Sequence, residues 1–324
     1  MTKTTDRLIF AAANAVLYAT NMNMVRRYRR TLHRLPNVAA PQLYSERMLW
    51  RKLVDHNPLF VVFSDKLAMK EFFRHRLPDL PLPRTLWIGD DAGDIPDELL
   101  RGDVYVKANH GSSFNYRVCG GVCDRAALRE ETRRWLRTTY GVKGGEWAYF
   151  KVKPRLFVEE AVGDVDGSLL DFKVRAGNGV AILGLVMGHA KTPAEWMVFL
   201  DPEGRPVPRT TDPEGAPVES TPEAQAAVGP YLRAVELARR LSVGVDSARF
   251  DFLWNGRELF GNEITVYPAA GTLDPTNSLT CGVLLRGWDL AQSHFLKSKH
   301  TGIKRIYANA LNRHLNRCEQ TSNQ

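Results

Sequence analysis

Near its carboxyl end the chain reads Ala248-Arg249-Phe250-Asp251-Phe252-Leu253-Trp254-Asn255-Gly256, and soon afterwards Leu259-Phe260-Gly261-Asn262-Glu263-Ile264-Thr265-Val266-Tyr267-Pro268. Apolar and polar residues alternate in both segments, which predicts strands over residues 248–253 and 258–266. Asn255-Gly256 is a dipeptide typical of a tight hairpin turn. We therefore expect the two strands to pair in antiparallel fashion.

This pairing would place two carboxylates, those of Asp251 and Glu263, together on one face of a sheet. Carboxylates with apolar neighbours repel each other unless a cation lies between them. Mg²⁺ suits such a site, because it binds one or two carboxylates together with nucleotide phosphates. Arg249 points to the same face, where it can contact a phosphate oxygen. A salt bridge between Arg249 and the carboxylates, without a metal, is the alternative.

The composition is that of an ordinary globular protein, with 324 residues, of which 44% are hydrophobic and 25% charged. These values exclude a disordered or collagen-like chain. Four cysteines are too few for a disulfide scaffold and favour a reducing compartment. No apolar run reaches the roughly 18–20 residues needed to span a bilayer. We therefore expect a cytoplasmic protein.

Positive charge is concentrated at the two ends of the chain. Residues 1–50 carry a net charge of +6 and residues 286–324 carry +5, which leaves −3 for the segment between them out of a total of +8. A nucleic-acid groove would need basic residues throughout the enzyme-sized middle segment. We therefore expect no nucleic-acid partner.

The amino end holds a short apolar segment followed by arginines. Residues 8–19 favour a helix. A basic cluster follows them, made of Arg26, Arg27, Arg29, Arg30 and Arg34. A secretory signal carries its charge before the apolar stretch, so this order argues against one. Two interpretations stay open: a helix lying on an anionic membrane surface, or a docking helix with a solvated basic face.

A lysine stands at the end of an apolar strand in the middle of the chain, in Asp103-Val104-Tyr105-Val106-Lys107-Ala108-Asn109-His110-Gly111-Ser112-Ser113. A lysine at this position can neutralise a phosphate, and the N–H groups of Gly111–Ser113 can surround one. The segment is not a Walker A loop, because it lacks the Gly-Lys-Ser/Thr tripeptide. A solvated lysine at a strand end is the alternative.

Two further predicted strands carry charged residues. Residues 156–163 lead from apolar residues into Glu159-Glu160 and then a glycine. In the strand that follows, alternation places Asp171 and Lys173 on one face. The Glu159-Glu160 pair could instead mark a strand end that turns into solvent.

The rest of the chain alternates helices and strands without an internal repeat. The expected helices are an amphipathic one from Tyr44 to Asn57-Pro58, and others over 64–76, 126–140 and 221–241. Ser64-Asp65-Lys66 is expected to form the N-cap of the helix that ends at Arg76. The expected strands are 86–88, 104–106, 156–158, 169–174 and 180–187, and the proline-rich segment 201–222 is expected to be a loop or flap. This order predicts an α+β protein rather than a doubly wound parallel sheet.

Taken in order, the strand lysine, the small-residue loop, the Glu-Glu pair and the late Arg-x-Asp…Glu pair resemble the ATP-grasp superfamily. The resemblance is closer to its TupA-like branch, which is associated with teichuronopeptide and other surface-polysaccharide assembly. It is carried by three segments, 44–66, 106–113 and 260–271, and covers roughly residues 40–290.

The resemblance implies an ATP-grasp fold, in which two α+β subdomains clasp a nucleotide, with an N-terminal helical extension. The implied domains are a basic helical extension (1–40), a helical or α+β lead-in (41–105), the ATP-grasp nucleotide-binding core (106–290) and a basic C-terminal helix and tail (291–324).

The resemblance also implies cofactors, ATP and Mg²⁺, and roles for single residues. The catalytic residues would be Lys107, Lys173 and Arg249. The nucleotide would be bound by Lys66, Lys107, Gly111, Ser112, Ser113, Glu159, Glu160 and Lys173, with the glutamates near adenine and ribose. The metal ligands would be Asp251, Glu263 and Thr265, although many members have Asn in place of Thr265. The candidates for the acceptor pocket are His110, His189, Lys191 and Trp196.

The implied reaction is the ATP- and Mg²⁺-dependent joining of a carboxylate to an amine through an acyl phosphate, in bacterial cell-surface polysaccharide biosynthesis. The partners would be ATP and a small molecule or polysaccharide that carries the carboxylate or amine. Two alternatives are a kinase of a sugar or glycan hydroxyl, and a non-catalytic scaffold for polysaccharide machinery or membrane. The basic amino end would suit peripheral contact with the inner face of an anionic membrane.

Overall fold

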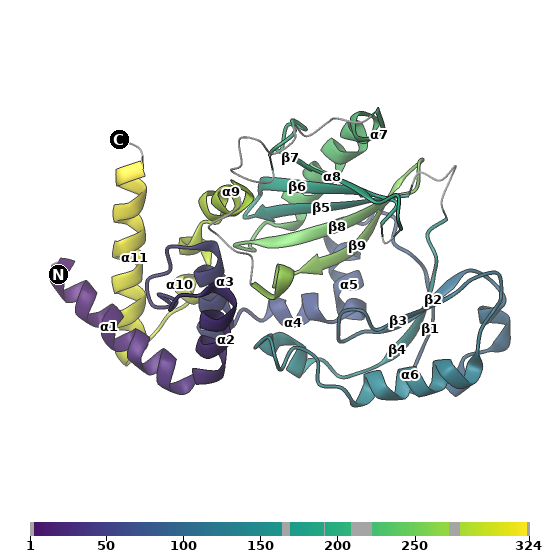
Figure 1. The fold of residues 1–324 in the computed structure, drawn as a ribbon, viewed down its shortest axis with the longest axis horizontal. Helices are drawn as coiled ribbons and strands as arrows, with labels where there is room; N and C mark the ends of the chain where they lie inside the picture. Colours follow the sequence, from purple (N-terminus) through teal and green to yellow (C-terminus); the bar gives the residue numbers. More distant parts are fainter. Residues whose placement is uncertain (1–2, 164–168, 191, 209–221, 272–278, 323–324) are drawn as a thin grey trace.

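The structure is a computed structural model that describes residues 3–163, 169–190, 192–208, 222–271 and 279–322. Two antiparallel sheets form its centre, one of four strands and one of five. Figure 1 shows the four-stranded sheet at the lower right, the five-stranded sheet above it, and a helical part that contains both chain ends on the left.

The four-stranded sheet has the strand order β1-β4-β2-β3. Its strands are β1 (Thr85–Gly89), β2 (Val104–Ala108), β3 (Asn115–Val118) and β4 (Leu156–Glu160). Helix α6 (Arg125–Arg137) covers one face, where Leu128 and Trp135 pack against Val106. Because side chains alternate along a strand, Lys107 points away from this core.

The five-stranded sheet has the order β7-β6-β5-β8-β9. Its strands are β5 (Leu170–Gly177), β6 (Val180–Gly188), β7 (Trp196–Leu200), β8 (Ala248–Trp254) and β9 (Leu259–Thr265). Helices cover one face, on which Phe172 and Phe250 are fully buried; they are α4 (Leu59–Ser64), α5 (Lys66–Arg76) and α8 (Val228–Leu241). The opposite face carries the charged residues of β5 and β8.

Helices from both chain ends pack into one unit (Figure 1). They are α1 (Lys3–Thr20), α2 (Met22–Leu32), α3 (Tyr44–Leu53), α9 (Leu279–Gly287), α10 (His294–Lys297) and α11 (Gly302–Ser322). The ring of Phe10 on α1 meets the ring of Tyr307 on α11, with centroids 6.5 Å apart. The buried carboxylate of Asp6 pairs with Arg313 at 2.6 Å and with Arg317 at 2.9 Å. Helix α1 is therefore docked on the C-terminal helix.

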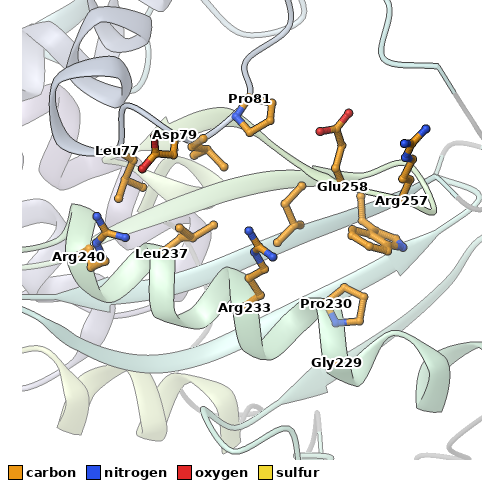
Figure 2. Close-up of a pocket in the computed structure, with 13 residues that line it drawn as sticks. Leu77, Asp79, Pro81, Gly229, Pro230, Arg233, Leu237, Arg240, Arg257 and Glu258 are labelled. Carbon is orange, nitrogen blue, oxygen red and sulfur yellow. The ribbon is translucent and has the colours of Figure 1, made fainter.

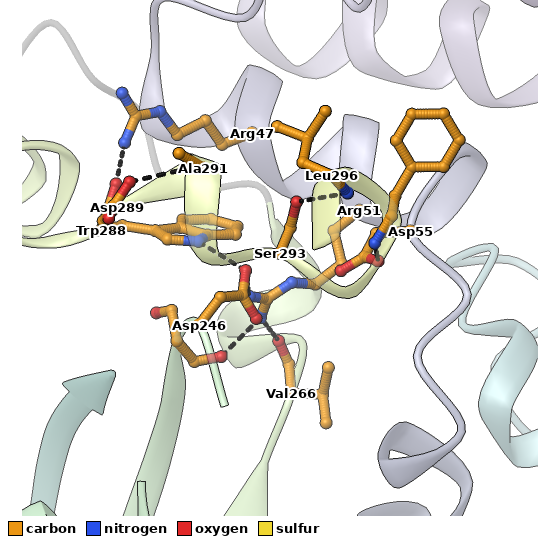
Figure 3. A network of polar contacts seen from close by, with 12 residues as sticks. Arg47, Arg51, Asp55, Asp246, Val266, Trp288, Asp289, Ala291, Ser293 and Leu296 are labelled. Atoms are coloured by element: carbon orange, nitrogen blue, oxygen red, sulfur yellow. Dashed lines mark hydrogen bonds and ion pairs between the residues drawn. The ribbon is translucent and has the colours of Figure 1, made fainter. Parts of the chain in front are cut away.

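A buried arginine fixes helix α3 to the five-stranded sheet (Figure 3). Arg51 is fully buried, and its Nη2 donates to Asp246 Oδ2 at 2.7 Å. Its guanidinium lies 4.1 Å from the ring centre of Trp288, whose Nε1 donates to the same Asp246 oxygen at 2.7 Å. Asp246 lies two residues before β8, so α3 is held against the end of the strand that carries Arg249.

The predicted hairpin is present, and Asp251 lies directly opposite Glu263 in it. The helix predicted from Tyr44 to Asn57-Pro58 was too long, because α3 ends at Leu53. Pro58 is instead the N-cap residue of α4, where its missing N–H costs no helical hydrogen bond. The helix predicted over 126–140 ends at Arg137.

Further differences lie elsewhere in the chain. The helix predicted over 221–241 is two helices, α7 (Pro222–Ala226) and α8. Strands β3 and β7 and helix α9 were not predicted. Residue 105, the expected end of the lead-in, lies within β2, and the division into domains stays a prediction. Most of the predicted flap, residues 209–221, lies outside the described residues. The remaining short elements are the 3-10 turns η1 (Ala92–Asp94), η2 (Asp97–Leu100), η3 (Trp147–Lys151), η4 (Pro268–Gly271) and η5 (Leu290–Gln292).

Within the described part of the chain, no single helix combines the length and the apolar composition needed to cross a bilayer. Helices α1 and α2 meet both criteria only when they are taken together, and they are bent by 100° at their junction.

Candidate active site

A buried carboxylate in the four-stranded sheet holds two lysines from different elements. Glu159 on β4 is 4% exposed, and its two oxygens form ion pairs with Lys107 on β2 and Lys70 on α5. Burial by itself would raise the pKa of Glu159, but the neighbouring ammonium groups of Lys107 and Lys70 outweigh it and lower the pKa. Glu159 therefore stays ionised and keeps both lysines in place.

The small-residue loop after β2 folds back onto helix α5. Lys66, the first residue of α5, donates a hydrogen bond from Nζ to the carbonyl of Gly111. Close packing requires glycine there, because a Cβ would lie 2.7 Å from the Phe114 ring and 3.1 Å from the Tyr140 ring. Ser113 has a φ of 62°, in the left-handed region. The loop backbone is thus held close to the lysines of α5 and β2.

A cavity of about 240 Å³ lies where the two sheets meet. It is lined by Lys66, Met69, Lys70, Lys107, Ser112, Ser113, Phe114, Asn115, Phe157, Glu159, Asn262 and Glu263. Cations from α5 and β2 and the carboxylate of Glu263 from β9 therefore border the same space. Six of the predicted site residues are among these twelve.

Charged residues also form a row across three strands of the five-stranded sheet. Lys173 on β5 lies opposite Asp251 on β8, which lies opposite Glu263 on β9. Arg249 holds both oxygens of Asp251, with Nε at 2.7 Å from Oδ1 and Nη2 at 2.5 Å from Oδ2. Its Nη2 is also 3.7 Å from Glu263 Oε2. Lys173 forms an ion pair with Asp171. The structure thus contains both the expected pair of carboxylates, Asp251 and Glu263, and the salt bridge with Arg249 that was given as the alternative.

A protein-family model identifies the family to which the chain belongs. The model of the TupA-like ATP-grasp family matches residues 46–284, a segment that contains every strand of both sheets. The chain belongs to the TupA-like ATP-grasp family. It is therefore an ATP-grasp enzyme that uses ATP and Mg²⁺, in the class that joins carboxylates to amines. The family and the fold class inferred from the motifs are confirmed.

Solved structures of similar fold are ATP-grasp ligases at low sequence identity. PsnB in complex with its minimal precursor is 13% identical, with a TM-score of 0.40 over 76% of this chain and 67% of that one. D-alanine–D-alanine ligase from Bacillus anthracis is 13% identical, with a TM-score of 0.37 over 83% and 72%. L-amino acid ligase from Bacillus licheniformis is 14% identical, with a TM-score of 0.38 over 65% and 44%. No curated protein matches the sequence.

In this ATP-grasp enzyme, the row of charged residues on the five-stranded sheet provides oxygen ligands that suit Mg²⁺. Asp251 and Glu263 supply paired carboxylates, the oxygen ligands that this hard cation prefers. Thr265 Oγ1 and Asp171 Oδ1 are buried and have no hydrogen-bond partner among the described residues, so two further oxygens are available. The described residues contain no group of three or more His, Cys, Asp or Glu with metal-binding geometry.

The two glutamates of the predicted hinge have different environments. Glu159 was expected near adenine and ribose, but both of its oxygens are engaged by lysines, so it acts as a positioning residue for Lys70 and Lys107. Glu160 faces the other way, as alternation along a strand requires. Its Oε2 accepts a hydrogen bond from Arg84 Nε at 2.6 Å. Glu160 remains a candidate contact for the nucleotide.

The residues suggested for the acceptor pocket do not gather in one place. His110 is 2% exposed and lies behind the loop, with its Nε2 3.1 Å from a carbonyl of α6, and burial lowers its pKa. Trp196 lies opposite Gly188 and packs on the helix-covered side of the sheet. His189 is exposed in the turn after β6. Lys191 lies outside the described residues. His110 and Trp196 are therefore packing residues here.

Two basic residues of the site were missed by the sequence analysis. Lys70 lies one helical turn after Lys66 on α5, and this spacing could have shown that both reach the same side. Arg175 lies two residues after Lys173 on β5, so the same alternation that placed Lys173 also places Arg175 on that face.

A separate cavity of about 590 Å³ lies beside helix α8, on the helix-covered side of the five-stranded sheet (Figure 2). The β8–β9 hairpin and the segment between α5 and β1 complete its walls. Three arginines line it: Arg233, Arg240 and Arg257. None of the predicted site residues that the structure describes lines this cavity, so it is not part of the nucleotide site.

Proposed function

We propose that this enzyme joins a carboxylate to an amine on a bacterial cell-envelope polysaccharide or its precursor, through an acyl phosphate. Membership of the TupA-like ATP-grasp family supports the ATP-dependent formation of a C–N bond. The polysaccharide acceptor and the acyl phosphate are what the proposal adds.

The observation that carries the proposal is the meeting of lysines and a carboxylate at one cavity. Lys66 and Lys107 border it on one side and Glu263 on the other. Ammonium groups neutralise phosphate oxygens, whereas carboxylates hold Mg²⁺. A cavity lined by both ammonium and carboxylate groups is suited to bind a nucleotide together with Mg²⁺.

The residues of the chain would act by positioning and by neutralising charge. Lys107 and Lys173 would bind phosphate oxygens, and Arg249 would stabilise the charge of the transferred phosphoryl group. The loop Gly111–Ser113 would cover the nucleotide and exclude water. Mg²⁺, when bound by Asp251 and Glu263, would neutralise charge between the phosphates. A carboxylate oxygen of the substrate would displace ADP from the terminal phosphorus, and an amine would then displace phosphate from the acyl group.

The first test is the calorimetric titration of ATP, with and without Mg²⁺, into wild type, Lys107→Ala and Lys151→Ala. We expect micromolar binding that requires Mg²⁺ and weakens about tenfold or more in Lys107→Ala. Lys151, an exposed lysine of η3, is the matched control and should bind ATP as wild type does. Absence of binding by wild type would contradict the nucleotide site.

Product analysis with carboxylate and amine acceptors, including uronic-acid polymers, then identifies the reaction. Release of ADP with stoichiometric free phosphate, dependent on both acceptors, supports the ligase. ADP with a phosphorylated sugar would instead show a kinase.

We further propose that the enzyme is cytoplasmic and contacts the inner face of an anionic membrane through α1 and α2. The side of α1 turned away from α11 exposes Leu8 (68% exposed) and Val16 (62% exposed). These residues lie on one helical face, because they are eight positions apart. Arg26 and Arg29 follow as exposed residues on α2. Apolar side chains that enter the interface beside arginines at the phosphates are typical of surface-bound helices.

Co-sedimentation with vesicles that contain phosphatidylglycerol tests the membrane contact in the full-length chain. Wild type should pellet with the vesicles, and Leu8→Asp/Val16→Asp should stay in solution. Leu232→Asp, at a residue 40% exposed on α8, is the control and should pellet. Equal pelleting of all three proteins, or none by wild type, would reject this contact.

A further inference from the structure

The cavity beside helix α8 lies on the opposite face of the five-stranded sheet from the row of Lys173, Asp251 and Glu263 (Figure 2). Trp254, which lines the cavity, follows Phe252 by two positions on β8, so both lie on the helix-covered face, whereas Asp251 lies on the other. The volume of about 590 Å³ exceeds the 240 Å³ of the cavity at the lysines. Ligand sites commonly measure about 300–1,000 Å³, so this cavity has the size of one.

Two walls of this cavity are fixed by hydrogen bonds of the backbone. Gly261 of β9 donates its N–H to the carbonyl of Pro81 at 3.0 Å, which ties the segment between α5 and β1 to the sheet. In the turn of the β8–β9 hairpin, Asn255 Oδ1 accepts from the N–H groups of Arg257 at 3.0 Å and Glu258 at 2.9 Å. The cavity is therefore preformed, and little ordering of the chain is needed when a ligand enters it.

Apolar side chains form the base of the cavity. Leu80, Leu237 and Trp254 line it and at the same time pack against the buried core of the sheet. Trp254 is only half-buried, so part of its indole ring is available to a ligand. An aromatic ring can pack against the apolar face of a sugar ring, and the indole N–H can donate a hydrogen bond to a hydroxyl.

Three exposed arginines surround this base: Arg233, Arg240 and Arg257. Within the part of the chain that the structure describes, none of them has an ion-pair partner, whereas Arg239 on the same helix pairs with Glu236 at 3.8 Å. Arg233 and Arg240 are seven positions apart, so they lie on one face of α8 and about 10 Å apart along its axis. Each guanidinium is therefore free to bind a separate acidic group.

Two carboxylates, those of Asp79 and Glu258, also border the cavity, and both residues are exposed. They leave the lining with one excess positive charge, which does not suit a nucleic acid, because every nucleotide of such a chain carries a phosphate. A carboxylate can, however, accept hydrogen bonds from hydroxyl groups. The ligand that matches the whole lining carries separated acidic groups, hydroxyls and an apolar ring face.

We propose that this cavity is a second binding site, which holds a segment of an acidic sugar chain. Carboxylates of the chain would bind Arg233 and Arg240, its hydroxyls would donate to Asp79 and Glu258, and a sugar ring would pack on Trp254. The role of the site, to retain a polymeric acceptor while another part of it reacts, rests on the proposed function. Retention raises the effective concentration of acceptor groups at the active site, so the acceptor is a polymer rather than a monomer.

The test is the calorimetric titration of three polymers, without nucleotide, into the full-length protein. Oligogalacturonate consists of acidic sugar units, poly-L-glutamate has the charge without the sugar, and dextran has the sugar without the charge. We expect wild type to bind oligogalacturonate at least about tenfold more tightly than either of the other two. Equal binding of oligogalacturonate and poly-L-glutamate, or no binding of oligogalacturonate, would overturn the site.

Two pairs of arginine substitutions separate the cavity from general attraction between charges. Arg233→Gln/Arg240→Gln should weaken the binding of oligogalacturonate about tenfold or more. Arg133→Gln/Arg137→Gln, at two exposed arginines of α6, removes the same charge outside the cavity and should bind as wild type does. An equal loss of affinity in the two double variants would show that the polymer is attracted only by the charge of the protein.

The carboxylates provide an independent variant, Asp79→Ala/Glu258→Ala. Simple attraction between charges would become stronger when two negative charges are removed, whereas a sugar site loses hydrogen-bond acceptors. We therefore expect weaker binding of oligogalacturonate, and stronger binding would contradict the proposal. Every variant should bind ATP with Mg²⁺ as wild type does, which also shows that it is folded. Failure of wild type to bind ATP would count against the proposed function and not against this site, because the polymers are titrated without nucleotide.

Discussion

Arg249 and Asp251 lie two residues apart on β8, and the guanidinium of the first holds both carboxylate oxygens of the second, at 2.7 and 2.5 Å. Asp251 is 2% exposed and faces Glu263 across the hairpin. The arginine therefore balances a pair of carboxylates that would otherwise repel each other. A metal that binds Asp251 has to compete with this arginine for the same oxygens.

Replacing Arg249 should make the stability of the protein depend on Mg²⁺. In Arg249→Gln, Asp251 and Glu263 lose their positive neighbour, so we expect a lower unfolding temperature than in wild type. Millimolar Mg²⁺ should restore part of the loss, because a ligand that binds only the folded state stabilises it. Thermal unfolding with and without Mg²⁺ checks this. In Asp251→Asn the Mg²⁺ effect should disappear, and an equal Mg²⁺ effect in all three proteins would contradict the metal site.

Gly111→Ala should weaken ATP binding through sterics alone. The added Cβ would lie 2.7 Å from the Phe114 ring, so the loop over the lysines has to shift. We expect the Kd for ATP to rise about tenfold, which corresponds to about 1.4 kcal/mol. Gly102→Ala is the matched control, because a Cβ there meets no atom within 4 Å. Calorimetry on both variants decides the matter, and unchanged affinity in Gly111→Ala would show that the loop does not cover the nucleotide.

Glu159→Gln should be strongly destabilising, whereas Glu160→Gln should not. Glu159 neutralises Lys70 and Lys107 in a buried site, and breaking such a pair costs about 3 kcal/mol or more. Glu160 pairs with Arg84 at the surface, where solvent screens an ion pair and its contribution to stability is small. Urea unfolding of both variants measures the difference.

Glu159→Gln should also change how the stability of the protein depends on pH. Because the folded state lowers the pKa of Glu159, its stabilising contribution is present above the usual glutamate pKa of about 4.3 and is lost as the pH falls through the lowered value. The wild-type advantage over Glu159→Gln should therefore shrink in acid. An advantage that stays constant down to low pH would show that the lysines do not perturb this carboxyl.

Asp55→Asn should stabilise the protein increasingly as the pH rises from about 4 to 7. Burial, followed by the neighbouring charge of Asp246, raises the pKa of Asp55 to about 7, against about 3.9 in an unfolded chain. A raised carboxyl pKa gives stability that is fully present below the unfolded pKa and is lost as the pH rises through the folded pKa. Wild type should therefore lose stability over this range relative to Asp55→Asn.

Asn retains the oxygen that accepts from the N–H of Phe295, a bond of 2.8 Å from Asp55 Oδ1 in the wild type. The substitution thus removes the titration and keeps this contact. Unfolding free energies at several pH values provide the measurement, and parallel curves for the two proteins would contradict the raised pKa.

Local patterns correctly predicted which charged residues share a face of the β8–β9 hairpin. The alternation in residues 248–253 and 258–266 placed Asp251 opposite Glu263 and Arg249 on the same side, because the side-chain period of a strand is two. The N-cap predicted for α5 is also present: Asp65 accepts from the N–H of Leu67 at 2.9 Å. These features depend only on residues close together in the chain.

The same patterns did not predict the environment of residues whose neighbours come from distant parts of the chain. Glu159 and Glu160 look alike in sequence, but only Glu159 meets Lys70, which comes from a helix nearly ninety positions earlier. His110 lies next to the small-residue loop, yet it packs under α6 instead of facing a substrate. A strand pattern predicts on which face of the sheet a side chain lies, but it does not predict which residues pack against that face.

The sequence by itself determined the hairpin, the face of each charged residue and the helix cap, since neighbouring residues and backbone geometry specify them. Tertiary structure decided which distant groups meet: Arg175 and Tyr44, 131 positions apart, and Arg51 and Asp246, 195 positions apart. The physical reason is that such pairs form only when burial of apolar surface packs the helical unit against the sheet. Once water is excluded there, each buried charge needs the partner that this packing brings to it.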